Sequence, residues 1–153
     1  GLPLGVMVAK ADVMAWPPGA HASTFGGNPV SCAAAIATIE LLRTSLVKNA
    51  AEVGDHLQQG LRALMDKHAI IGDVRGKGLM VGVELVRDRA TKERATTERN
   101  AVVNEAFTRG MLILGAGQNA VRFSPPLVLS KAQADTAIRL FDESLTAVTT
   151  RGK

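Results

Sequence analysis

The sequence predicts an α+β fold in which helices cover one face of a sheet. Stretches with apolar residues at every third or fourth position, typical of helices, are interspersed with shorter stretches in which apolar and polar residues alternate, typical of strands. The composition fits one core, because 46% of the 153 residues are hydrophobic and 21% are charged. A chain of this length can bury a single core.

The N-terminal part is predicted to contain one strand and one helix. Residues 4–9 form a short apolar run that ends at charged residues, which predicts a buried strand. Asn28 followed by Pro29 predicts a helix start, because Asn caps free amides and proline suits the first helical position. The helix is predicted over about residues 29–43. Its apolar residues recur at helical spacing, so we expect it to pack against another part of the chain.

The middle of the chain is predicted to hold a second helix and a strand. Apolar residues recur at helical spacing from about Ser45 to Lys67. Residues 79–85 then alternate between apolar and other side chains, which predicts a half-buried strand. The glycines at positions 76 and 78 predict a hairpin turn before it.

The C-terminal part is predicted to hold two further helices and two short strands. A helix is expected over residues 97–109 and ends at Gly110, and short strands are expected at residues 111–114 and 120–123. Ser130 and Gln133 have the spacing of a capping box, which predicts the start of the last helix.

Composition argues against several classes of partner. The net charge of +4 is spread along the chain, and only 3% of residues are aromatic, with no Tyr, so we expect no nucleic-acid partner. No apolar stretch approaches the roughly 20 residues that span a bilayer, so we expect no membrane partner. Cys32 is the single cysteine and excludes an intrachain disulfide, which fits a cytoplasmic protein.

The histidines do not predict a metal site. His21, His56 and His68 lack the spacing of metal ligands, and no second cysteine is present to help them. We expect His56 and His68 to be solvent-facing helical residues.

Two places have residues that suit a small anionic ligand. Ser23 and Thr24 precede two glycines and the helix capped by Asn28, and hydroxyls beside glycine amides at a helix start can hold a phosphate. The same pattern also describes an ordinary loop before a capped helix. Arg122 alternates with Val121 and Phe123, so its fork should point away from the core and could grip a carboxylate. The alternative is a solvated surface arginine.

Four motifs together resemble the class III pyridoxal-phosphate-dependent aminotransferases, above all the 4-aminobutyrate, acetylornithine and ornithine branches. The resemblance covers nearly the whole chain and rests on the order and spacing of GLPLG at 1–5, PGAHASTFGGNP at 18–29, VRGKGLM at 74–80 and RFSPPL at 122–127.

This resemblance implies the C-terminal small domain of a type I aminotransferase fold, with a terminal strand and linking helices from the large domain. Residues 1–44 would be the residual large-domain strand, phosphate loop and linking helix, and residues 45–153 the small domain. The family's Schiff-base lysine would lie a few residues before Gly1. The resemblance therefore assigns no catalytic residue to this chain.

The resemblance also implies roles for the candidate residues. Thr24 would bind the phosphate of pyridoxal 5'-phosphate across a homodimer interface, Ser23 would lie near the substrate, and Arg122 would hold the substrate carboxylate. The expected function is to help move an amino group from an amino acid to a 2-oxo acid, in association with the missing N-terminal half, the fragment alone being inactive. The alternative is a non-catalytic binding or assembly module that retains the small-domain fold.

Overall fold

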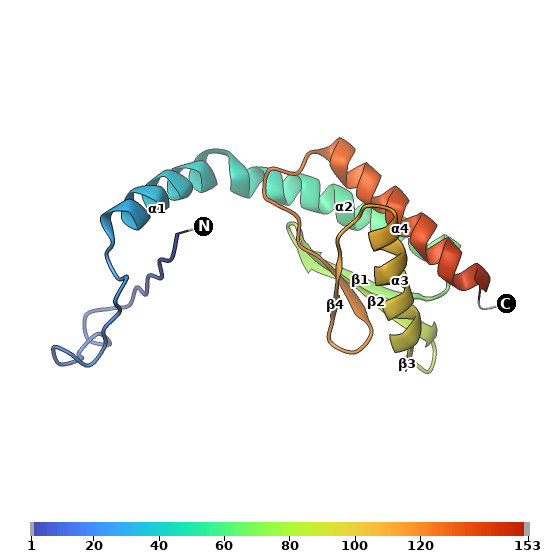
Figure 1. Cartoon of the computed structure of the whole chain (residues 1–153), viewed down its shortest axis with the longest axis horizontal. Helices are drawn as coiled ribbons and strands as arrows, with labels where there is room; N and C mark the ends of the chain where they lie inside the picture. The colour runs from blue at the N-terminus through green and yellow to red at the C-terminus, as the bar shows by residue number, and fades with distance from the viewer. Residues whose placement is uncertain (1, 152–153) are drawn as a thin grey trace. The chain divides into compact units, whose positions relative to one another are not determined.

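The computed structural model describes residues 2–151, which form two compact units, Gly1–Ser45 and Leu46–Lys153. We call them the first unit and the second unit, and each is described by itself. Figure 1 labels the helices and all strands except β5. Almost all of the buried core belongs to the second unit.

The strand predicted at residues 4–9 is absent: this segment has no regular secondary structure. Its apolar side chains are exposed, with Val6 at 78% and Val8 at 89% of full exposure. The prediction was wrong for the described residues because a strand needs a neighbouring strand for its hydrogen bonds, and none pairs with this segment there.

The first helix, α1 (Pro29–Leu41), begins where the sequence predicts. The Asn28 side chain accepts hydrogen bonds from the backbone amides of Val30 and Ser31, both at 3.1 Å, and Pro29 takes the first helical position. The expected packing does not occur within the described residues, because Ser31 is the one buried residue of α1. Its apolar side chains remain exposed, Ile36 at 70%.

A five-residue π-helical turn (Leu42–Leu46) joins α1 to α2 (Val47–Lys67). The sequence expectation about membranes needs a correction here. The helical run from Pro29 to Lys67 contains an 18-residue window with a mean hydropathy of 1.5, so by length and composition it could cross a membrane. Very little of that window is buried, whereas the later part of the run, α2, buries Val53, Leu57 and Leu61 in the second unit.

The second unit contains an antiparallel sheet with strand order β1-β2-β5-β4, and β3 pairs with the far end of β2. The strands are β1 (Ile71–Lys77), β2 (Met80–Asp88), β3 (Glu93–Arg94), β4 (Leu114–Ala116) and β5 (Ala120–Phe123). The predicted hairpin and the strand at 120–123 are confirmed. The strand predicted at 111–114 lies two to three residues later, because Met111 and Ile113 belong to the core as an irregular segment and pairing starts only at Leu114.

Three helices, α2, α3 (Thr96–Thr108) and α4 (Lys131–Arg151), pack against the sheet or against one another on one side of it. The predicted capping box of α4 is formed: the Gln133 amide donates to the Ser130 hydroxyl at 3.2 Å, and the Ser130 amide donates to Gln133 Oε1 at 2.9 Å. The predicted α+β fold, with helices over one face of a sheet, is therefore confirmed.

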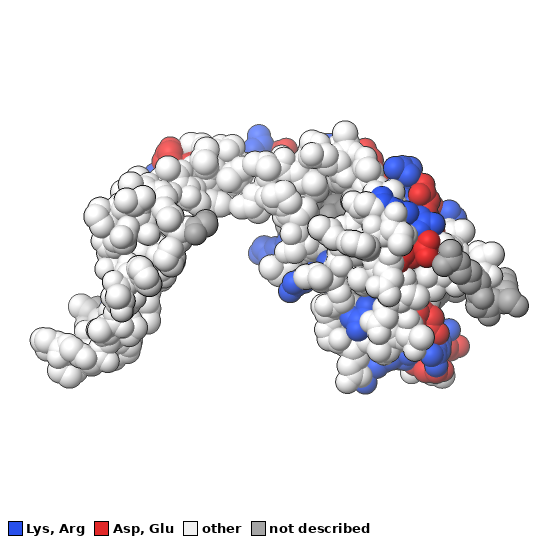
Figure 2. Space-filling view, in the orientation of Figure 1, with Lys and Arg blue, Asp and Glu red and all other residues white. Residues whose placement is uncertain are grey.

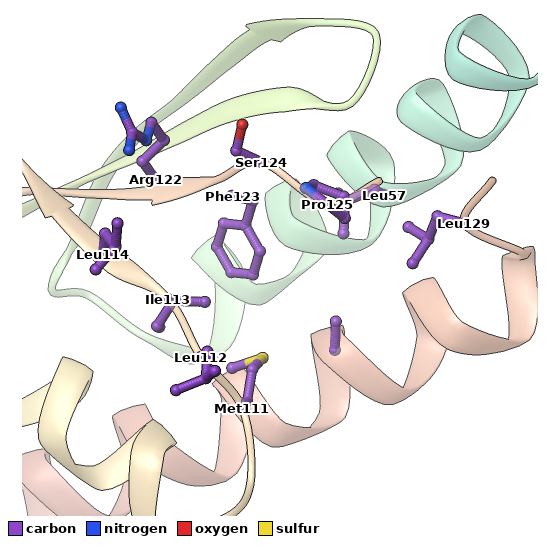
Figure 3. Close-up of a pocket in the computed structure, with 11 residues that line it drawn as sticks. Leu57, Met111, Leu112, Ile113, Leu114, Arg122, Phe123, Ser124, Pro125 and Leu129 are labelled. Atoms are coloured by element: carbon purple, nitrogen blue, oxygen red, sulfur yellow. The ribbon is translucent and has the colours of Figure 1, made fainter. Parts of the chain in front are cut away.

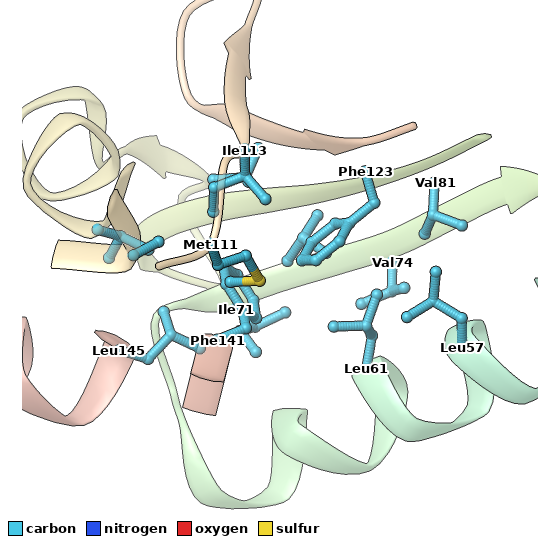
Figure 4. Packing of buried hydrophobic residues seen from close by; sticks show 14 of the residues in the cluster. Leu57, Leu61, Ile71, Val74, Val81, Met111, Ile113, Phe123, Phe141 and Leu145 are labelled. Atoms are coloured by element: carbon cyan, nitrogen blue, oxygen red, sulfur yellow. The ribbon is translucent and has the colours of Figure 1, made fainter. Parts of the chain in front are cut away.

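The core lies between these helices and the inner face of the sheet. Leu57 and Leu61 of α2 point toward Val74 and Val81 of the sheet (Figure 4). Phe123 of β5 meets Phe141 of α4 edge to face, with ring centroids 5.2 Å apart. Such aromatic contacts tie the last helix to the centre of the sheet.

Helix α2 passes very close to the hairpin between β1 and β2. A Cβ atom added at Gly54 would lie 2.3 Å from the carbonyl carbon and oxygen of Gly78, which no real side chain tolerates. Gly78 has a φ of +55°, a conformation that favours glycine. A glycine inside a helix costs stability, and the close approach of α2 to Gly78 explains why residue 54 is a glycine.

Two polar contacts of Asp142 join α4 to the end of α2. His68, at 6% exposure, contacts Asp142 Oδ1 through Nε2 at 2.5 Å, and the Lys67 ammonium donates to Asp142 Oδ2 at 2.7 Å. The expectation that His68 faces solvent was wrong, because α4 covers it. Partial burial raises the pKa of Asp142, but the bonds from His68 and Lys67 outweigh burial and hold it below its ordinary value.

We expect Phe141→Ala to lower the free energy of unfolding by about 3 to 5 kcal/mol, because it leaves a cavity beside Phe123 in a fully buried position. Phe107→Ala is the matched control, since Phe107 is 66% exposed on α3 and its loss should cost less than about 0.5 kcal/mol. Urea unfolding of the two variants measures both values. Equal losses would contradict the described core.

We expect the stabilising effect of Asp142 to disappear in acid. Its lowered pKa means that the folded state favours the carboxylate, so the contribution is present at neutral pH and is lost as the pH falls below 3.8, the ordinary value. The difference in unfolding free energy between wild type and Asp142→Asn should therefore shrink between pH 7 and pH 3. Asp66→Asn, an exposed position in α2, is the control. A difference that stays constant with pH would contradict the assignment.

Candidate functional site

Ser23 and Thr24 lie in a tight turn directly before α1. The Gly26 amide donates to the Ser23 carbonyl at 3.2 Å, and the Asn28 amide donates to the Phe25 carbonyl at 3.2 Å. Gly27 has a φ of +74° and so accommodates the turn before the helix. These local hydrogen bonds form the turn from its own residues.

The hydroxyls of Ser23 and Thr24 are free donors in this turn. Both residues are exposed, and neither hydroxyl forms a hydrogen bond among the described residues. The first α1 amides are less available, because the Asn28 side chain already accepts from two of them. Ser23 borders a hollow that is also lined by Leu4, His21 and Gly26. The residues present therefore fit an anionic group held by hydroxyls rather than by the helix end.

Arg122 lies on the open face of the sheet, as its alternation with buried neighbours predicts. Val121 is fully buried and Phe123 is 4% exposed, whereas Arg122 is exposed. Figure 3 shows the Arg122 guanidinium on the opposite side of β5 from the Phe123 ring. Among the side chains that the structure describes, no hydrogen bond or ion pair involves this guanidinium.

A pocket of about 200 Å³ lies next to Arg122 but on the inner side of the strand. Its walls are mostly apolar and come from α2, α4, β5 and the segment before β4, with Leu57, Met111, Phe123 and Leu129 among them. Arg122 stands at its margin, with its charged end pointing away from Phe123 (Figure 3). A carboxylate bound by Arg122 would therefore lie on the open face rather than in this pocket.

The open face is the side of the sheet opposite the helices. The strand register places four positions in one row across it: Arg75, Gly82, Arg122 and Leu114. Gly82 leaves the space between the two arginines free, since a Cβ added there would meet only the Arg75 carbonyl oxygen, at 3.9 Å. Arginines from β1 and β5 thus flank a gap in the middle of the sheet.

The two arginines differ in their partners. Arg75 Nη1 donates to Asp73 Oδ2 at 2.6 Å and to Glu84 Oε2 at 2.8 Å. The bond from Arg75 holds the pKa of the Glu84 carboxyl below its ordinary value, although partial burial raises it, and Asn119 helps to lower it. The charge of Arg75 is therefore balanced within the sheet, and that of Arg122 is available to a ligand.

Charged side chains are concentrated in the second unit. Residues 1–45 contain only Lys10, Asp12, Glu40 and Arg43, and most of the blue and red surface in Figure 2 belongs to the rest of the chain. Within residues 2–151, no group of three His, Cys, Asp or Glu side chains could hold a metal ion.

The predicted site residues fall into both units. Ser23 and Thr24 share one turn of the first unit, and Arg122 belongs to the second. The sequence did not indicate that Arg75, Gly82 and Glu84 lie beside Arg122 on the open face, although Arg75 belongs to the motif VRGKGLM at 74–80. The hairpin turn was a usable signal, because pairing about it sets Arg75 opposite Gly82.

Comparison with known proteins gives one consistent family. A model of the class III aminotransferase family matches residues 1–145. The chain is 37% identical over 149 residues to the acetylornithine aminotransferase of Caldanaerobacter subterraneus, covering 97% of this chain and 36% of that protein. It is 39% identical over 150 residues to the leucine/methionine racemase of Thermococcus litoralis, covering 97% and 34%.

Solved structures agree with the sequence comparison. An aminotransferase from Bacillus anthracis superposes with a TM-score of 0.79 at 33% identity, over 84% of this chain and 30% of that one. The chain thus spans about a third of the length of the curated relatives it matches. On the family match and the shared fold, the chain belongs to the class III aminotransferases.

Proposed function

We propose that this chain is the C-terminal part of an enzyme that moves an amino group from an amino acid to a 2-oxo acid. The donor class that we favour is 4-aminobutyrate, ornithine or acetylornithine. Family membership supports the reaction class, and the relative named acetylornithine aminotransferase supports the donor class. We place the enzyme in the cytoplasm and the two domains at residues 1–44 and 45–153.

The observation that carries the proposal is the unpaired guanidinium of Arg122 on the open face. Every donor and acceptor in such a reaction carries a carboxylate, and arginine binds a carboxylate through two parallel hydrogen bonds. Because the strand fixes its backbone and Phe123 anchors the next residue in the core, Arg122 presents its guanidinium to a substrate from a fixed backbone position. In this proposal Ser23 lies near the substrate.

The proposed cofactor is pyridoxal 5'-phosphate, and the free hydroxyl of Thr24 fits its phosphate. When bound, this cofactor supplies an electron sink for charge that develops on the substrate carbon. Thr24 would anchor it by a hydrogen bond to a phosphate oxygen, across the interface of a homodimer. The lysine that binds the cofactor covalently would come from sequence before Gly1, so this chain supplies anchoring and orientation, and by itself is inactive.

A second candidate reaction comes from the relatives. One protein that is 39% identical is named a leucine/methionine racemase, and another at 38% is named an isoleucine 2-epimerase. These names favour inversion at the α-carbon as the alternative to transfer. Both reactions need a bound carboxylate, so Arg122 alone does not separate them.

The test is an assay of the complete protein that contains this segment. It is supplied with pyridoxal phosphate, an amino donor and 2-oxoglutarate, and the products are separated by chiral chromatography. Amino transfer predicts a new amino acid formed from the 2-oxo acid in proportion to donor consumed. Change of donor configuration without any need for the 2-oxo acid would replace our proposal with the racemase reaction. Absence of both reactions with all donors would contradict it.

Replacing Thr24 with Ala in the complete enzyme should weaken cofactor retention by about ten- to a hundredfold. A hydrogen bond to a charged group contributes roughly 1.5 to 3 kcal/mol, which corresponds to that range of affinity. Equilibrium dialysis against pyridoxal phosphate measures the change. Thr38→Ala is the control, because the Thr38 hydroxyl of α1 already donates to the Ala34 carbonyl. Unchanged affinity in Thr24→Ala would make Thr24 an ordinary loop residue.

Replacing Arg122 with Lys should reduce kcat/KM for carboxylate-bearing donors about a hundredfold, because Lys keeps the charge and loses the planar fork. A simple amine without a carboxylate should react at nearly the wild-type rate. Single-turnover kinetics with both donors measure this difference. The control is Arg139→Lys, since Arg139 lies exposed on α4 and pairs with Glu143. Equal losses for both donors, or none, would exclude the carboxylate-binding role.

A further inference from the structure

The open face contains a carboxylate that could compete with the substrate for Arg122. Glu84 follows Gly82 by two residues on β2, so its side chain lies on the same face. Gly82 is paired with Arg75 on one side and with Arg122 on the other. Glu84 is therefore a diagonal neighbour of both arginines, and diagonal neighbours in a sheet are within reach of long side chains.

The structure shows Glu84 committed to one of the two arginines. Its Oε2 accepts from Arg75 Nη1 at 2.8 Å, and its Oε1 accepts from the buried amide of Asn119 at 3.3 Å. Asn119 is itself held, since its Nδ2 donates to the Leu85 carbonyl at 2.7 Å. Both carboxylate oxygens thus have partners, and neither partner is Arg122.

We propose that Arg75 is a positioning residue that restrains Glu84 and thereby keeps Arg122 unpaired and open to the substrate carboxylate. The open space at Gly82 makes this restraint necessary, because no side chain separates the diagonal neighbours. The catalytic consequence of this proposal rests on the proposed function of Arg122. The restraint itself is a property of this sheet and can be measured without substrate.

The other charged groups around Glu84 define the competing outcomes. From β1 these are Asp73 and Arg75, and from β5 Arg122, while β4 contributes no charged side chain. Arg89 and Lys92 line a hollow together with Asp73 and Glu84. Arg89 is committed to three backbone carbonyls, those of Met65, His68 and Ile71. Lys92 is therefore the rival cation for a released Glu84.

The first test uses the 153-residue chain and nuclear magnetic resonance. Carboxyl carbons and arginine Nε–H groups are followed from pH 7 to pH 3. In wild type, the Arg75 Nε–H signal should move with the titration of Glu84 and the Arg122 signal should not. In Arg75→Gln, the Arg122 signal should follow Glu84. A wild-type Arg122 signal that follows the titration of Glu84 would overturn the proposal. So would an Arg75→Gln variant in which Glu84 titrates without any change in the Arg122 signal, because Glu84 would then be paired with Lys92 alone.

The second test uses the complete enzyme and measures KM and kcat separately. In Arg75→Gln, Glu84 competes with the donor carboxylate for Arg122. Exposed ion pairs favour the paired state by roughly 1.4-fold to fivefold, so KM for a carboxylate-bearing donor should rise about twofold to sixfold with kcat nearly unchanged. The double variant Arg75→Gln/Glu84→Gln should restore KM, because it removes the competitor as well.

Asp73→Asn is the matched control for the kinetic test. It removes one of the two acceptors of Arg75 and leaves Glu84 held, so KM should stay near the wild-type value. A raised KM that the double variant does not restore would show a structural effect of losing Arg75 and overturn the proposal. If Arg122→Lys affects both donor types equally, the proposed function fails instead, and the resonance experiment still decides whether Arg75 restrains Glu84.

Discussion

The alternation of side chains along β2 and β5 is the constraint on which the rest of the second unit depends. Val81 and Val83 of β2 and Val121 of β5 are fully buried on one face, and Arg122 lies on the other. A shift of one residue in either strand would exchange the two faces. Such a shift would expose the core and bury a charged arginine. The burial of the apolar face therefore determines which side chains lie on the open face. The outward direction of Arg122 is in this sense a consequence of core packing.

The helices secure that register from the inner side. Helix α2 approaches the β1–β2 hairpin so closely at Gly54 and Gly78 that a methyl group would not fit. Helix α4 adds the edge-to-face contact of Phe141 with Phe123, directly beside Arg122 in the chain. Because packed interiors have few voids, these contacts leave β5 little freedom to slide. They restrain the backbone of Arg122 from the inner face of the sheet, while its side chain lies on the open face.

The first unit is fixed in a different way. Among its described residues only Ser31 is buried, and its hydrogen bonds are local, as in the turn at 23–28 and the Asn28 cap. Exposed apolar side chains are common there, on residues 6–8 and along α1. Large exposed apolar surfaces usually mark interaction sites. The hydroxyls of Ser23 and Thr24 are thus exposed by the local hydrogen bonds of the turn, and the apolar side chains of this unit are exposed as well.

The sequence by itself determined the features that depend on neighbours in the chain. The Asn28 cap, the capping box of Ser130 and Gln133, the hairpin turn and the outward direction of Arg122 all follow from residue type and spacing, and four motifs in order indicated the family. Tertiary structure decided what depends on distant partners. The apolar run at 4–9 is no strand because none of the described residues pairs with it, α1 is uncovered, and His68 is buried by a helix some seventy residues later in the sequence. The pairing of Glu84 with Arg75 rather than Arg122 was likewise decided there, since both arginines are diagonal neighbours and only the hydrogen bonds of the folded sheet distinguish them.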